Sequence, residues 1–135
     1  MDIQESLHRI LERKEDVAAR FYTLFFERHP EVVPHFARVD LRQQGVLLTM
    51  ALLIMERNYA HDYPATANYL RHLGTKHHTR EIPPELYPKF RDTLLTSLAQ
   101  FHGADWAPEL ARQWGEAIDQ TSALMLEGYA QRFTV

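Results

Sequence analysis

Apolar side chains recur in this chain at the three- and four-residue spacing of an α-helix, and this spacing limits its fold more than any other feature. In one stretch, Val17, Phe21, Leu24 and Phe25 lie on a single helical face. Strict alternation over a strand's length is hard to find, and glycine, which weakens helices, occurs only five times. The sequence therefore predicts an all-α fold. Its 135 residues suit one domain with a core of its own.

N-cap candidates, prolines and a glycine divide this pattern into six substantial helices. Asp2 and Asp40 can each cap a helix N-terminus. Pro30 ends the second helix because the residue before a proline avoids helical geometry, and Pro64 can open the fourth. Gly103 ends the fifth. The predicted helices hold residues 3–11, 16–29, 41–55, 64–77, 87–101 and 108–129, with a turn-like piece at 30–36.

The longest apolar run extends from Val46 to Met55. A helix that is apolar almost all round predicts a place in the middle of the molecule. At about ten residues the run is too short to cross a bilayer. Residues 1–15 are charged and lack the apolar core of a secretion signal. We therefore expect a single cytoplasmic domain over residues 1–135, without a membrane partner.

Composition excludes several other classes of protein. The formal net charge is −3, and acidic and basic residues are interleaved along the chain. Binding to nucleic acid needs a basic face, so nucleic acid is not expected as the main partner. The chain has no cysteine, which excludes disulfides, thiolate catalysis and cysteine-bound zinc.

His77 is the strongest candidate for a metal ligand. It follows Leu70 by seven residues and Leu73 by four, so the three share one helical face, whereas His78 points away by roughly a quarter turn. A neutral imidazole on an apolar helix face is a good axial ligand for haem iron. The same spacing also fits a hydrogen-bonded core histidine. The remaining histidines with polar neighbours are predicted to lie at the surface: His8, His29, His61, His72 and His102.

Other candidates are ambiguous when taken one at a time. Tyr22 stands among phenylalanines and is either a core tyrosine or a phenol that donates a hydrogen bond into a pocket. Phe36 is by default a core anchor. Gln43 and Gln44 open the apolar helix, where most glutamines are solvated.

Two segments together resemble the globin family, in particular the single-domain bacterial globins and the haem domain of flavohaemoglobins. Residues 21–36 look like the B and C helices of that family, and residues 76–87 look like the F-helix segment that leads into the G helix. Trp114 matches the H-helix tryptophan. The resemblance covers nearly the whole chain. It implies a globin fold with helices A, B, C, E, F, G and H, and no D helix because the link after Phe36 is short.

The resemblance also implies a cofactor, haem b (iron protoporphyrin IX), and assigns roles to particular residues. His77 corresponds to the proximal metal ligand, Tyr22 to the distal B-helix tyrosine and Phe36 to the haem-stacking phenylalanine. Tyr87, ten residues after His77, corresponds to the G-helix tyrosine. The residues predicted to contact the cofactor are Tyr22, Phe36, Gln44, Leu48, His77 and Tyr87.

The distal glutamine has two possible registers. The family places glutamine four residues before leucine, and both Gln44 with Leu48 and Gln43 with Leu47 fit. Gln44 and Leu48 are preferred because they need one fewer inserted residue before the proximal histidine.

The chain departs from the family at one proximal position. Flavohaemoglobins support the proximal histidine with a tyrosine and a glutamate, which favours oxygen activation. Counting from Trp114 places Tyr129 at the position of that glutamate, and Glu127 lies roughly 200° away around the helix. A fully peroxidase-like activation of oxygen is therefore not expected.

The function implied is reversible binding of O2, and of CO and NO, at a five-coordinate His77-ligated iron, for storage, delivery or sensing. No catalytic residue is assigned. One alternative is a nitric oxide dioxygenase that needs a separate reductase, since no Gly-x-Gly motif indicates a flavin or nicotinamide domain. The other is a haem-free globin-like module that senses signals or binds a signalling partner.

Overall fold

The computed structural model describes residues 1–13 and 16–130. Its elements, in chain order, are α1 (Ile3–Glu12), α2 (Asp16–Arg28), η1 (Pro30–Phe36), α3 (Leu41–Ala60), α4 (Pro64–Thr79), α5 (Leu86–His102), η2 (Gly103–Asp105) and α6 (Pro108–Ala130). The six predicted helices are present, and the described residues contain no strand. Residues 37–40 join η1 to α3 without a helix between them. None of the described helices combines the length and apolar character needed to cross a membrane.

Local chemistry explains where several helices begin and end. The Asp2 side chain accepts a hydrogen bond from the Glu5 amide at the start of α1, and Asp40 accepts one from the Arg42 amide at the start of α3. Pro30 follows α2 and Pro64 is the first residue of α4. Gly103, with φ of 58°, follows α5, because glycine takes this left-handed conformation without steric cost.

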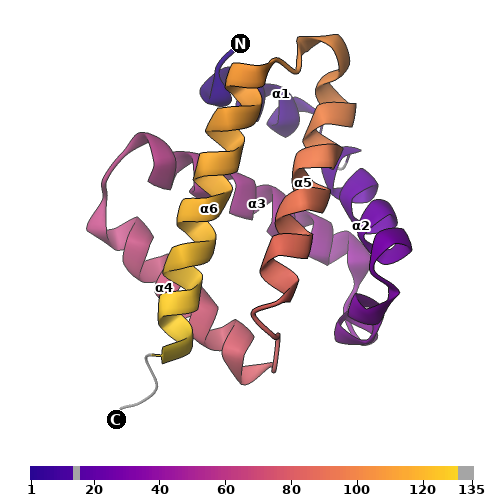
Figure 1. Ribbon diagram of the computed structural model, residues 1–135, viewed down its shortest axis with the longest axis vertical. Coiled ribbons are helices and arrows are strands. Elements are labelled where there is room, and N and C mark those ends of the chain that lie inside the picture. The colour runs from indigo at the N-terminus through magenta and orange to yellow at the C-terminus, as the bar shows by residue number, and fades with distance from the viewer. Residues whose placement is uncertain (14–15, 131–135) are drawn as a thin grey trace.

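The α5–α6 hairpin forms the centre of the molecule. Figure 1 shows these two helices side by side, with α1 near the end where they join and α3 crossing behind them. Helix α2 packs against α5, and α4 packs along α6. The fully buried side chains at this centre come mainly from α5 and α6: Leu94, Leu98, Leu110, Trp114 and Ile118.

Helix α3 buries one face only, so the prediction that its apolar run lies wholly inside is wrong. Leu48 and Leu52 are buried, but Val46, Leu47 and Met50 are each about half exposed. Helix α3 contacts α1, α2, α4 and α6, and these contacts leave the face with Val46, Leu47 and Met50 exposed. Apolar composition alone does not reveal how many sides of a helix are covered.

Helices α4 and α6 meet backbone to backbone. A Cβ atom added at Gly74 would collide with the Met125 carbonyl, and one added at Gly128 would collide with the Arg71 carbonyl. The Thr75 hydroxyl donates to the Gly128 carbonyl at 2.9 Å across this contact. The two glycines therefore allow α4, which carries His77, to rest directly on α6.

Candidate functional site

Four of the predicted site residues form a distal group, namely Tyr22, Phe36, Gln44 and Leu48. Tyr22 extends from α2 and is 8% exposed. Its ring centroid lies 5.5 Å from that of Phe36, at an interplanar angle of 66°, and 5.9 Å from that of Phe26. Phe26 in turn contacts Phe36 at 5.4 Å. The Tyr22 phenol is thus surrounded by aromatic rings from α2 and η1.

The Tyr22 hydroxyl remains protonated over a wide pH range. Burial raises the pKa of Tyr22 to about 12, because a phenolate loses its hydration there, while a side-chain hydrogen bond with Gln44 acts in the opposite direction. At neutral pH this group can therefore donate a hydrogen bond. A donor in an apolar enclosure interacts strongly with a polar ligand because little water competes.

The close approach of α2 and α3 decides which glutamine faces Tyr22. Gly45 is buried, and a Cβ atom placed there would lie 3.3 Å from the Ala18 side chain. The residue before it, Gln44, is half-buried beside α2. Gln43 is exposed and points elsewhere. One turn further along, Leu48 is 4% exposed and Leu47 is 55% exposed. Gln44 and Leu48 therefore share the inward face, and Gln43 and Leu47 do not.

His77, Tyr87 and Tyr129 form a second set, called here the proximal group. His77 is half-buried on α4, and its Nδ1 lies 2.9 Å from the Leu73 carbonyl oxygen. A carbonyl can only accept, so Nδ1 carries the proton and Nε2 keeps its lone pair. Burial lowers the pKa of His77, although the Leu73 carbonyl opposes this shift. The result is a neutral imidazole whose orientation is set by the backbone, as a metal ligand requires.

A strained residue ends the helix that carries His77. The Ile82 amide donates to the His77 carbonyl at 3.1 Å, which closes the last turn of α4. This closure places Glu81 at φ of 61°, a left-handed conformation that is unfavourable for any residue with a Cβ atom.

The remaining members of the proximal group are two neutral phenols. The Tyr129 hydroxyl donates to the Ile82 carbonyl at 2.7 Å, and its ring lies 5.9 Å from that of Tyr87. The Tyr87 hydroxyl is enclosed and has no hydrogen-bond partner within residues 1–13 and 16–130. Burial and the neighbouring Tyr129 raise the pKa of Tyr87, even though the two hydroxyls do not meet in hydrogen-bond geometry.

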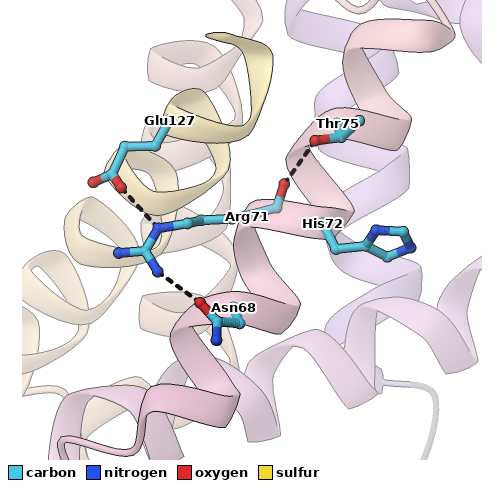
Figure 2. A pocket seen from close by; sticks show the side chains of 5 residues that line it. All are labelled: Asn68, Arg71, His72, Thr75 and Glu127. Carbon is cyan, nitrogen blue, oxygen red and sulfur yellow. Dashed lines mark hydrogen bonds and ion pairs between the residues drawn. The ribbon is translucent and has the colours of Figure 1, made fainter. Parts of the chain in front are cut away.

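Glu127 does not belong to the proximal group. It pairs with Arg71 at 2.8 Å, and its side chain is 53% exposed. Figure 2 shows the Arg71 guanidinium between Glu127 and Asn68 in a surface pocket between α4 and α6, with His72 pointing away from this network. The carboxylate is thus held at the surface.

His102, predicted to be a surface residue, is instead 8% exposed and contacts the Ser6 hydroxyl at 2.6 Å. The residues that follow it, 103–105, form the short η2 element. The sequence offered one signal of burial, since His102 follows Leu98 by four residues on the apolar face of α5.

Comparison with known proteins establishes the family. The model of the Globin family matches residues 19–125, which is most of the chain. The chain belongs to the globin family, and its all-α fold is that of a globin.

The similar curated proteins are mostly longer than this chain. A flavohemoprotein of Bacillus thuringiensis is 26% identical over 118 residues, covering 85% of this chain and 28% of the relative. A flavohemoprotein of Deinococcus radiodurans is 26% identical over 113 residues, covering 83% of this chain and 28% of the relative. An uncharacterized globin-like protein of Aquifex aeolicus is 24% identical over 117 residues, covering 87% of this chain and 81% of the relative. The chain thus spans little more than a quarter of the flavohemoproteins it matches.

Globin membership implies haem binding, and the described residues fit this group. His77 offers the neutral nitrogen donor that haem iron takes, with its second nitrogen already engaged. Tyr22 and Phe36 offer aromatic surface suited to a flat apolar macrocycle. The enclosed Tyr87 hydroxyl lacks a partner, as expected of a polar atom beside a site that holds a further group.

Proposed function

We propose that this chain holds haem b through His77 and binds O2 reversibly beneath Tyr22 and Gln44, for storage, delivery or sensing of the gas. The observation that carries the proposal is the Tyr22 hydroxyl, which is protonated at neutral pH, enclosed by aromatic rings and close to Gln44. Bound haem would supply an iron with one open coordination position for O2, CO or NO.

The chain's own residues then determine how long a ligand stays. Tyr22 donates a hydrogen bond to a polar ligand such as O2, and Gln44 lies close to the phenol. Leu48 and Phe36 limit the entry of water, which would compete for that donor. CO is less polar and gains less from the bond. One such bond contributes roughly 1–3 kcal/mol, or up to about two decades in a dissociation rate.

The proximal group favours binding over oxygen activation. The Nδ1–H of His77 donates to a backbone carbonyl and not to a carboxylate, so the imidazole keeps its neutral character. The two nearby phenols are uncharged at neutral pH, and Glu127 is paired with Arg71 at the surface.

The test is the rate of O2 release from Tyr22→Phe, measured by stopped-flow absorbance. We expect release at least tenfold faster than in the wild type and a smaller change for CO. Tyr69→Phe, which alters an exposed tyrosine, is the matched control and should leave both rates unchanged. An unchanged O2 rate in Tyr22→Phe would overturn the proposed role.

Haem binding has its own test in the absorption spectrum of the purified chain. We expect a Soret band in the wild type and its weakening or loss in His77→Ala, while His72→Ala, at an exposed position on the same helix, keeps it. A chain without this band after supply of haem would favour the haem-free sensor or interaction module.

A nitric oxide dioxygenase is the second candidate, because several relatives are flavohemoproteins. This activity would need electrons from a separate reductase as partner. Consumption of NO with stoichiometric nitrate formation, measured with an added reductase, would favour the enzyme. Ligand binding without NO turnover would favour the gas-binding function.

A further inference from the structure

A buried polar cluster joins α1 to the far end of the α5–α6 hairpin. The Ser6 side chain of α1 is fully buried, and its Oγ lies 2.6 Å from His102 Nε2 on α5. The Trp114 indole of α6 donates to the same oxygen at 2.9 Å. Ser6 therefore links three helices through one hydroxyl. Ser6 is fully buried and His102 is 8% exposed, so a substrate cannot reach this pair. The role of the pair must therefore be conformational.

The donors in this cluster can be assigned from chemistry. An indole N–H can only donate, so Ser6 Oγ accepts from Trp114 and leaves its own proton able to point to His102. When it does so, His102 Nε2 accepts, and the ring is neutral and protonated at Nδ1. If the ring takes up a second proton, Nε2 becomes a donor, the Ser6 proton has to turn away from it, and a positive charge lies in a buried position.

The surroundings of His102 disfavour a charged ring. Burial lowers the pKa of His102, and the positive charge of Arg9 on α1 adds to this effect. Asp105 of η2 opposes it but is itself paired with Arg9 at 2.7 Å. Helix α6 presents the uncharged Trp114. The Trp106 ring stacks on His102 at 6.0 Å and would favour charge, but the net direction remains downward.

We propose that Ser6, His102 and Trp114 form an acid-sensitive latch, which releases α1 from α5 and α6 when His102 is protonated. Besides this cluster, α1 is held by the apolar side chains of Ile3, Leu7 and Ile10, by the Arg9–Asp105 ion pair and by the hydrogen bond from the Ile3 amide to Gln113 of α6. Release returns the ring to water, where its pKa regains the ordinary value of about 6.5. Docking of α1 is therefore complete above that pH and weakens as the pH falls below it.

Hydrogen–deuterium exchange of the full chain, followed by mass spectrometry between about pH 7.5 and 5.5, tests the latch. After correction for the intrinsic effect of pH on exchange, peptides from residues 3–12 should exchange up to about tenfold faster for each unit of acidification. Peptides from α5 and α6 should stay protected. Peptides from α4 report separately on any acid effect at His77. Loss of protection in all helices together would overturn the proposal, because acid would then unfold the chain globally.

Two variants sharpen the test. In His102→Gln the side-chain oxygen can still accept from Ser6 but cannot titrate, so exchange in α1 should lose its dependence on pH. The matched control His8→Gln removes an exposed histidine from α1 and should keep the wild-type profile. If His102→Gln does not fold, the latch is still tested in the wild type, by comparing the pH dependence of exchange in α1 with that in α5 and α6. A profile in folded His102→Gln that equals the wild type would refute the latch.

Discussion

On the distal side of the candidate haem site, the groups that face a ligand are side chains, whereas on the proximal side most of the positioning comes from the backbone. Tyr22 is held by neighbouring rings and by Gln44. His77 is oriented by the Leu73 carbonyl, and α4 rests on α6 through Gly74 and Gly128. The distal side can therefore be tuned by exchanging side chains, whereas changes at the proximal backbone contact should damage the fold. The predictions below test this difference.

The largest effect is expected at the contact between α4 and α6. In Gly128→Ala the new Cβ would collide with the Arg71 carbonyl, and two packed helix backbones cannot move apart cheaply. We expect a loss of about 3 kcal/mol or more in the free energy of unfolding, measured with urea.

Gly115→Ala is the matched control on the same helix. Its Cβ would approach only the flexible end of the Arg91 side chain, at 3.2 Å, and alanine favours the helix. We expect a neutral or slightly stabilising effect. Equal losses of unfolding free energy in Gly128→Ala and Gly115→Ala would show that the packing of α4 on α6 does not depend on contact between their backbones.

The next effect concerns the distal phenol at alkaline pH. The pKa of Tyr22 is raised to about 12, so its stabilising contribution is complete below its ordinary value of 10 and is lost as the pH rises towards 12. We expect an alkaline loss of unfolding free energy that is smaller in Tyr22→Phe than in the wild type by about 1–2 kcal/mol, the remainder coming from Tyr87, whose pKa is also raised. Urea unfolding at pH 9 and pH 11 measures it. Tyr63→Phe, at an exposed position, should behave like the wild type.

A smaller effect of opposite sign is expected from the proximal phenols. Tyr87→Phe removes a buried hydroxyl that lacks a partner, so the chain should become more stable by up to about 1 kcal/mol. Tyr129→Phe removes the hydrogen bond to the Ile82 carbonyl and should cost about 1 kcal/mol. Thermal unfolding of Tyr87→Phe and Tyr129→Phe measures the two changes in stability. If both variants lose stability, the Tyr87 hydroxyl has a partner after all.

The smallest effect is expected at the end of α4. Glu81 has φ of 61°, so Glu81→Gly should relieve strain and stabilise the chain by roughly 0.5–1 kcal/mol. Arg80→Gly changes the preceding residue, whose φ is −85°, and should destabilise instead. Urea unfolding of both variants distinguishes strain relief from a general effect of glycine.

Much of the fold could be predicted from local patterns. The six helices follow from apolar spacing, and Pro30 and Pro64 mark boundaries because proline restricts the backbone wherever it occurs. The start of α3 follows from Asp40 as its cap, but the prediction ended too early, since the helix continues past Met55 to Ala60 through polar residues that carry no apolar pattern. The exposure of Val46 and Met50 and the burial of His102 could not be predicted, because both depend on which helices pack nearby.

The sequence by itself determined the helical class of this protein, its place in the globin family and the helical phase that puts His77 on the face of Leu70 and Leu73. These properties depend on residues close together in the chain. Only the tertiary structure half-buried Gln44 while leaving Gln43 exposed, turned Glu127 outward and brought Tyr129 to Ile82. It also enclosed Ser6 between His102 and Trp114. Each of these outcomes depends on contacts between distant segments, which helical periodicity does not encode.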